Sequence, residues 1–216
     1  MNIWQDFKNN NQKEIDKWLH YFPVYERHFS DWRNKTLVFW EIGVQSGGSL
    51  QMWQRFFGPS AIIIGIDIDP ECAKHSEDNI VVRIGNQTDK AFLQSIVDDF
   101  GPPDIILDDG SHVMSDILET FMYMYPLLSK NGVYMVEDLH TAYDERFGGN
   151  MNDPNTFINV SKSIIDDLNA EHTYGKIEPN FMTRFTLGIH FYDSVVVYQR
   201  GIIPIRKALR TGNADM

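Results

Sequence analysis

The sequence D-I-I-L-D-D-G-S-H at residues 104–112 and the sequence G-V-Y-M-V-E-D-L-H-T-A-Y at residues 132–143 decide the expected fold. Each contains a short apolar run that predicts a buried strand, and each run stops at a pair of acids. The four acids at these strand ends are Asp108, Asp109, Glu137 and Asp138. Because ligands bind at the carboxyl ends of the strands in an open α/β sheet, we expect the acids and His112 to converge on one site.

The rest of the chain alternates apolar runs with helical stripes. Further buried strands are expected at residues 36–42, 61–66 and 79–84. Apolar side chains at helical spacing predict helices near residues 49–57, 90–100, 117–128 and 157–168. Two runs at 185–192 and 195–199 flank Asp193-Ser194 and predict an antiparallel hairpin. The alternation predicts a mostly parallel, doubly wound α/β sheet that ends in this hairpin.

We expect one domain at residues 36–210, preceded by an N-terminal helical extension at residues 1–35. Apolar residues at helical spacing before Pro23 predict a short helix, a break at the proline and a second helical turn across residues 13–29. The aromatic and histidine side chains of this segment either pack in the core or cap an active site as a lid. They are His20, Tyr21, Tyr25 and His28.

The composition excludes several classes of partner. The formal net charge is −11, which repels phosphate backbones and anionic lipid surfaces, so nucleic acid and membranes are poor candidates. The longest aliphatic run, residues 61–66, is far shorter than a transmembrane helix, and the N-terminus lacks the apolar core of a signal peptide. The single cysteine, Cys72, suits a reducing compartment. A cytoplasmic protein is expected.

A glycine turn follows the first expected strand, in W-E-I-G-V-Q-S-G-G-S-L at residues 40–50. Glycines let the backbone approach a ligand, and the next helix offers free N–H groups at its start. The spacing matches neither the dinucleotide fingerprint nor a phosphate-binding loop. Asp67 ends the second strand, where an acid can accept hydrogen bonds from ribose hydroxyls. The turn at residues 85–89 either reaches an adenine edge or only supplies Asp89 as a helix cap.

Taken in order, these motifs resemble the class I S-adenosylmethionine-dependent methyltransferases. Within them they are similar to the metal-dependent sugar O-methyltransferases of macrolide biosynthesis, the mycinamicin and rhamnosyl type, over roughly residues 36–200. The resemblance implies a Rossmann-like seven-stranded sheet and Mg²⁺-dependent methyl transfer from S-adenosyl-L-methionine to a hydroxyl of a sugar or glycosylated small molecule. Such relatives can carry a separate N-terminal domain that shapes the oligomer and the acceptor pocket. The identity of the acceptor is therefore not carried over, and a homo-oligomer stays open.

The resemblance also assigns roles to residues of this sequence. Its cofactor-binding positions are Glu41, Gly43, Gly47, Gly48, Ser49 and Asp67, with Gln87 near the adenine. The metal ligands that it implies are Asp109, Glu137 and Asp138, with His112 as general base. Asp108 is grouped with the cofactor-binding residues, although we expect it mainly to cap a backbone turn or to hold the loop.

The residue types fit this chemistry. Mg²⁺ prefers carboxylate and water oxygens, whereas clustered acids without a metal would repel one another. His112 follows Asp109 by three residues and suits a general base, although it could instead be a structural histidine at a helix start. Two other functions stay open. One is hydroxylation of an antibiotic nucleus, for which the sequence offers no clear two-histidine-one-carboxylate iron site. The other is a cofactor-binding module without chemistry.

Overall fold

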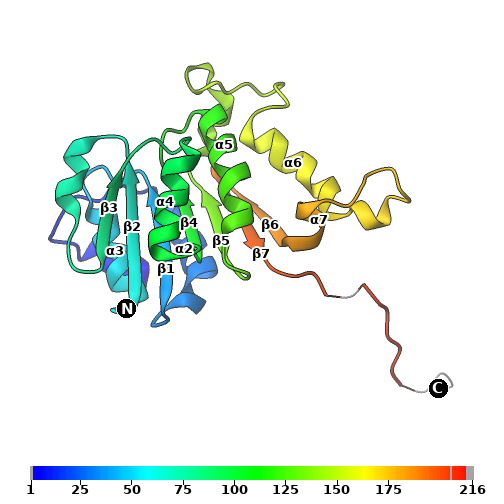
Figure 1. Cartoon of the computed structure of the whole chain (residues 1–216), viewed down its shortest axis with the longest axis horizontal. Helices are drawn as coiled ribbons and strands as arrows, with labels where there is room; N and C mark the ends of the chain where they lie inside the picture. The colour runs from blue at the N-terminus through cyan, green and yellow to red at the C-terminus, as the bar shows by residue number, and fades with distance from the viewer. Residues whose placement is uncertain (1, 205, 213–216) are drawn as a thin grey trace.

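The structure is a computed structural model that describes residues 2–204 and 206–212. Within these residues seven strands form one sheet in the order β3-β2-β1-β4-β5-β7-β6 (Figure 1). The strands are β1 Leu37–Ile42, β2 Ala61–Asp67, β3 Ile80–Ile84, β4 Ile105–Asp108, β5 Val133–Val136, β6 Thr186–Tyr192 and β7 Val195–Arg200. The first five pair in parallel, and β7 runs antiparallel to both β5 and β6. The predicted doubly wound sheet with a C-terminal hairpin is confirmed.

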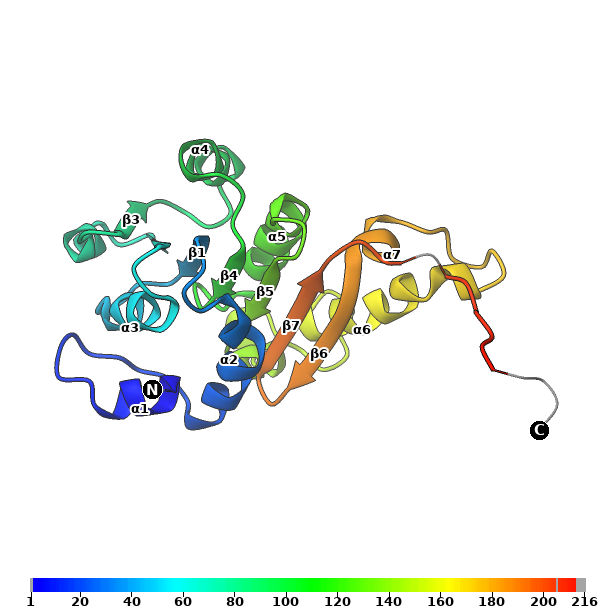
Figure 2. The same cartoon turned by 90° about the horizontal axis from the view of Figure 1, so that it is seen from below.

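Helices cover both faces of the sheet, as the view in Figure 2 shows. One face packs against α1 Ile3–Lys8, α2 Phe22–Phe29 and α3 Gly48–Phe57. The other face packs against α4 Lys90–Phe100, α5 Met114–Met124, α6 Phe157–Leu168 and α7 Phe181–Phe185. Short 3₁₀ turns are η1 Leu19–Tyr21, η2 Ser30–Trp32, η3 Pro70–His75, η4 Tyr125–Leu127, η5 Leu139–Tyr143, η6 Glu145–Phe147 and η7 Ala170–His172. Across residues 2–204 and 206–212, every helix is too short or too polar to cross a bilayer.

The alternation of side chains along each strand decides which helical layer a polar residue meets. In β1, Leu37 and Phe39 pack in the core beneath α1 to α3, whereas Trp40 and Ile42 pack beneath α4 to α7. Glu41 lies between the last two, so its carboxylate points to the α3 side. There it meets polar partners instead of the aliphatic core.

The same rule separates the acids at the ends of β4 and β5. Leu107 pairs with Glu41 in register and packs beneath α1 to α3. Because side chains alternate along the chain here, Asp108 and Asp109 point to opposite layers. Asp108 enters the α4 and α5 side, and Asp109 faces the side of α3. Glu137 follows Val136, a residue of the α4 to α7 core, and it therefore shares the side of Asp109.

The prediction for residues 13–29 is wrong in its first half. Residues 10–18, which we call the N-terminal strap, form no helix, and Pro23 lies in the first turn of α2 instead of breaking a helix. A proline is well tolerated there because the first turn needs no N–H at that position. The strap packs over the start of α3: a Cβ atom on Gly48 would lie 2.2 Å from the carbonyl oxygen of Glu14. Tertiary contact therefore replaces the expected helix.

Candidate active site at the carboxyl ends of β1, β2, β4 and β5

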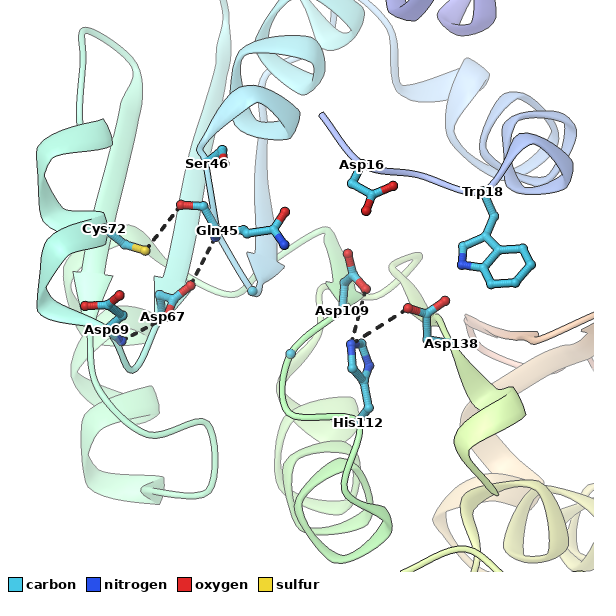
Figure 3. Close-up of a pocket in the computed structure, with 12 residues that line it drawn as sticks. Asp16, Trp18, Gln45, Ser46, Asp67, Asp69, Cys72, Asp109, His112 and Asp138 are labelled. Carbon is cyan, nitrogen blue, oxygen red and sulfur yellow. Dashed lines mark hydrogen bonds and ion pairs between the residues drawn. The ribbon is translucent and has the colours of Figure 1, made fainter. Parts of the chain in front are cut away.

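A cavity of about 560 Å³ opens at the carboxyl ends of the parallel strands (Figure 3). Asp109, His112 and Asp138 line one end of it, and Asp67 lies toward the other. A smaller cavity of about 200 Å³ adjoins the first and shares Asp67 with it. This second cavity is lined by the exposed side chain of Ile68, by Gln87 and by loop backbone. Together they form an elongated cleft with an acidic end and a more apolar end.

Asp109, His112 and Asp138 meet at the acidic end of this cleft. One ligand atom from each lies within 4.8 Å of the others. His112 Nε2 is 3.9 Å from Asp109 Oδ1 and 3.8 Å from Asp138 Oδ2. His112 and Asp138 both adopt left-handed backbone conformations, with φ of 58° and 52°. Such a conformation is costly for a residue with a Cβ atom, and it often marks functional sites. Here it turns both side chains toward Asp109.

The N-terminal region holds Asp138 in place. The Tyr21 hydroxyl donates a 2.6 Å hydrogen bond to Asp138 Oδ1, and the Asp138 backbone N–H donates to the same hydroxyl oxygen at 3.3 Å. Tyr21 is buried, and burial together with the bond to Asp138 raises the pKa of its phenol well above the usual range. The phenol therefore remains a proton donor. The lid role considered for Tyr21 stays a prediction, but its contact with a site carboxylate is a structural fact.

Glu137 lies apart from this group, in contact with Lys17 of the strap. Lys17 Nζ is 2.9 Å from Glu137 Oε2, 2.5 Å from Asp109 Oδ2 and 3.4 Å from Glu41 Oε1. Burial lowers the pKa of Lys17, but Asp109 and Glu137 raise it more, so the net shift is upward and the group is an ammonium. Sequence reasoning missed Lys17 because its acidic partners lie 92 and 120 residues away along the chain. The Glu137 carboxylate is buried, and the Tyr25 hydroxyl interacts with it as well.

Four of the proposed cofactor-binding residues face the strap or the helix instead of the cavity. Glu41 is fully buried and accepts hydrogen bonds from the Ser49 hydroxyl at 2.7 Å and from Trp53 Nε1 at 3.1 Å. A Cβ atom on Gly47 would lie 2.6 Å from the ring of His75, and Gly48 packs under the strap. These contacts fix the start of α3. Direct cofactor contact by Glu41, Gly47, Gly48 and Ser49 remains a prediction.

Gly43 and Asp67 do line the cleft. Gly43 has φ +95°, and a Cβ atom there would lie 2.1 Å from the carbonyl oxygen of Asp109, so the close passage of the two loops needs glycine. Asp67 Oδ2 accepts the backbone N–H groups of Val44 at 2.8 Å and Gln45 at 3.2 Å. Burial raises the pKa of Asp67, but the backbone donors, including these two, lower it by more. The net shift of the Asp67 pKa is therefore downward. An ionised carboxylate thus holds the glycine loop between the two cavities.

Asp108 and Gln87 form a buried network beside the cleft. Gln87 Nε2 is 3.3 Å from Asp108 Oδ1, and Gln87 Oε1 accepts the backbone N–H of Ser111 at 2.9 Å. The Tyr134 hydroxyl donates to Asp108 Oδ2 at 3.2 Å. Burial raises the pKa of Asp108 to about 7. Asp108 therefore holds the loop that carries His112, and it lies on the opposite side of β4 from the metal candidates.

The residues present fit both implied groups. Two carboxylates meet at the acidic end, and Glu137 is a third, buried carboxylate on the same side of the sheet. Such a donor set suits a hard divalent ion such as Mg²⁺, whereas a histidine nitrogen is a less favoured ligand for Mg²⁺ and is free to handle a proton. The elongated cleft, with Asp67 in the middle and Gln87 and Ile68 at the apolar end, suits an adenosyl group.

The chain is similar in sequence to known proteins along most of its length. No family model matches the chain. It is 36% identical over 203 residues to an 8-demethyl-8-(2-methoxy-α-L-rhamnosyl)-tetracenomycin-C 3′-O-methyltransferase of Streptomyces olivaceus, covering 86% of the chain and 51% of the relative. It is 37% identical over 201 residues to the mycinamicin VI 2″-O-methyltransferase of Micromonospora griseorubida, covering 85% of the chain and 49% of the relative.

Solved structures show the same likeness. The MycE methyltransferase of the mycinamycin pathway, in complex with Mg, SAH and mycinamycin VI, superposes with a TM-score of 0.81 at 32% identity. The match covers 94% of the present chain and 55% of MycE. By fold and by sequence the chain is similar to methyltransferases that use S-adenosylmethionine. Its relatives within that class are sugar O-methyltransferases of the mycinamicin type. The chain spans about half the length of these curated relatives.

Proposed function

We propose that the chain is a Mg²⁺- and S-adenosylmethionine-dependent O-methyltransferase that acts on a hydroxyl of a sugar or glycosylated small molecule. The observation that carries the proposal is the meeting of Asp109, His112 and Asp138 at one end of a cleft that has Asp67 at its middle. Methyl transfer to a hydroxyl needs an acceptor site beside a cofactor site, because the methyl donor must lie in line with the acceptor oxygen.

Each residue has a role in this chemistry. His112 takes the proton of the acceptor hydroxyl, and its Nε2 lies 3.9 Å from Asp109 Oδ1 and 3.8 Å from Asp138 Oδ2. Asp109, Asp138 and Glu137 would hold a divalent ion, which would supply electrostatic stabilisation of negative charge on the acceptor. Tyr21 positions Asp138, and Asp108 positions the loop of His112 through Gln87, which accepts the backbone N–H of Ser111. The left-handed backbone at His112 and Asp138 keeps this geometry in place.

The rim of the cleft supports a sugar as the acceptor. Trp18 is 55% exposed, and its ring centroid lies 5.6 Å from that of His140. His140 Nδ1 is 2.9 Å from Ser194 Oγ, which fixes the imidazole. An exposed aromatic face with polar groups beside it suits a sugar ring, which has both apolar C–H faces and hydroxyls. We also keep the division into residues 1–35 and 36–210 as a proposal. A cytoplasmic location is a proposal as well, and the unpaired Cys72 supports it.

Neither alternative function is favoured. Within the described residues, the candidate metal group has two carboxylates and one histidine, which is the reverse of the two-histidine-one-carboxylate iron site of oxygenases. A module without chemistry would not need a histidine and two acids in convergent positions, with left-handed backbone at His112 and Asp138. Both observations favour transfer of a methyl group.

Calorimetric titration with S-adenosylhomocysteine, with and without Mg²⁺, tests the proposal. We expect saturable binding of the nucleoside, and separate saturable binding of Mg²⁺ that Asp109→Asn weakens at least about tenfold, because it removes one charged ligand. As a matched control, Asp116→Asn changes an acid that lines the smaller cavity away from the acidic end. A protein that fails to bind S-adenosylhomocysteine, or that fails to bind Mg²⁺, would overturn the proposal.

A further inference from the structure

Lys17 contacts two of the carboxylates that would bind a divalent ion. Its ammonium contacts Asp109 Oδ2 at 2.5 Å and Glu137 Oε2 at 2.9 Å, and its side chain is only 3% exposed. We propose that Lys17 competes with the divalent ion: it binds Asp109 and Glu137 in the metal-free protein and leaves when both carboxylates bind the ion. This inference rests on the metal dependence in the proposed function, and it names the residue that sets metal affinity.

Competition follows from the sharing of Asp109. One oxygen of this carboxylate faces Lys17 and the other faces His112. Mg²⁺ takes its oxygen ligands at about 2.0–2.1 Å in near-octahedral geometry. An ammonium in hydrogen-bond contact with Asp109 and Glu137 therefore stands next to, or within, the coordination shell that the ion requires. Two cations that share the same carboxylates at this distance repel each other strongly in a buried setting.

Lys17 lies on a segment without regular secondary structure, so its side chain can move away from the carboxylates. Residues 10–18 have neither helix nor strand, and Lys17 is the one buried residue among them. Its neighbours Asp16 and Trp18 both line the large cavity (Figure 3). Lys13 on the same strap pairs with Glu77 at the surface, through an exposed ion pair that contributes little. Lys17 is thus the main polar anchor of the strap, and its release changes the wall of the cavity beside the acceptor.

The proposal makes metal binding and strap docking mutually exclusive for the Lys17 side chain. By thermodynamic linkage, a change that weakens the Lys17 contact and leaves the carboxylates intact must strengthen metal binding. A purely structural lysine that only orients the acids would behave in the opposite way, because its loss would leave the carboxylates less well placed for the ion. The sign of the change in metal affinity therefore separates the two roles.

Lysine-selective acylation of the wild-type protein, read by mass spectrometry, is the first test. Without metal, Lys17 should react slowly because it is buried, whereas Lys13 should react readily. Saturating Mg²⁺ should raise the reactivity of Lys17 several-fold relative to Lys13, which serves as the internal control. Mg²⁺ binding that leaves the Lys17 to Lys13 ratio unchanged would overturn the inference.

Calorimetric Mg²⁺ titration of variants is the second test. Lys17→Met keeps the length of the side chain and removes the competing charge, so it should tighten Mg²⁺ binding by about tenfold or more. Lys13→Met should bind Mg²⁺ as the wild type does, and Lys17→Arg should stay weak because it keeps the charge. Equal or weaker binding by a folded Lys17→Met protein would overturn the inference.

The two tests separate the inference from the proposed function. A wild-type protein that binds no Mg²⁺ overturns both. A wild-type protein that binds Mg²⁺, with flat acylation and unchanged variant affinity, overturns the inference alone. Circular dichroism establishes whether Lys17→Met is folded, since removing the cation leaves Glu41 and Glu137 buried without it. If that variant does not fold, the acylation of the wild-type protein decides the question.

Discussion

Replacing Tyr21 by phenylalanine should weaken metal binding without removing any ligand. The hydroxyl of Tyr21 donates a 2.6 Å bond to Asp138 Oδ1 from a ring that is 1% exposed. A hydrogen bond to a charged group contributes about 1.5–3 kcal/mol. Loss of a partner that orients a metal ligand typically reduces metal affinity by about 10–100-fold, which corresponds to about 1.4–2.8 kcal/mol. The two ranges agree, so we expect Tyr21→Phe to weaken Mg²⁺ binding by that factor.

The assay is a calorimetric Mg²⁺ titration, with Tyr125→Phe as the matched control. The Tyr125 hydroxyl is also buried and lies 2.9 Å from Thr186 Oγ1, but it is remote from the acidic end. Tyr125→Phe should lose about 1 kcal/mol of unfolding free energy, and Tyr21→Phe about 1.5–3 kcal/mol, because Tyr21 bonds to a charged carboxylate and Tyr125 to a neutral hydroxyl. Only Tyr21→Phe should change the affinity for Mg²⁺. Equal Mg²⁺ affinities in the two variants would refute the reasoning that Asp138 is a ligand held by Tyr21.

Three further predictions concern other parts of the molecule. His112→Gln should lower turnover by about 10²–10⁴-fold while S-adenosylhomocysteine binds as before, and turnover within tenfold of wild type would exclude His112 as the base. Gly43→Ala should abolish cofactor binding or folding, because its Cβ would meet Asp109 O at 2.1 Å; calorimetry and circular dichroism check this. Burial, with His190 and Arg27, lowers the pKa of His28 to about 4, so only the unfolded state gains a proton as the pH falls from 6.5 to 4. Stability should fall by roughly 2–3 kcal/mol over that range, and denaturant unfolding should show no such slope in His28→Gln.

The fold was predictable because apolar runs and glycine turns are local signals. The helices at 90–100 and 157–168 and the strand at 133–136 match the structure to the residue, since each has a clear cap or apolar period. The strap was not predictable, because Ile15, Trp18 and Leu19 share a helical period that contact with α3 and the carboxylates overrides. Propensity gives way wherever tertiary contacts are strong.

The site was predictable in part. Its acids follow strand ends, and the parallel sheet brings strand ends together, so Asp109 and Asp138 meet as expected. Strand alternation also explains why Asp108 lies on the opposite side, which was a signal available from the sequence. Lys17 was not predictable, because its three acidic partners come from three strands far along the chain. Contacts of that range follow only from the folded structure.

The central claim is that the acids and His112 catalyse metal-assisted methyl transfer. The most direct measurement is mass-spectrometric detection of methyl transfer from S-adenosylmethionine to a panel of rhamnosides and other glycosides, with Mg²⁺ and with excess chelator. We predict a product 14 mass units heavier than the acceptor, which is lost with the chelator and restored by Mg²⁺. Undiminished transfer in the presence of the chelator, or the absence of any methylated product across the panel while S-adenosylhomocysteine and Mg²⁺ bind, would contradict it.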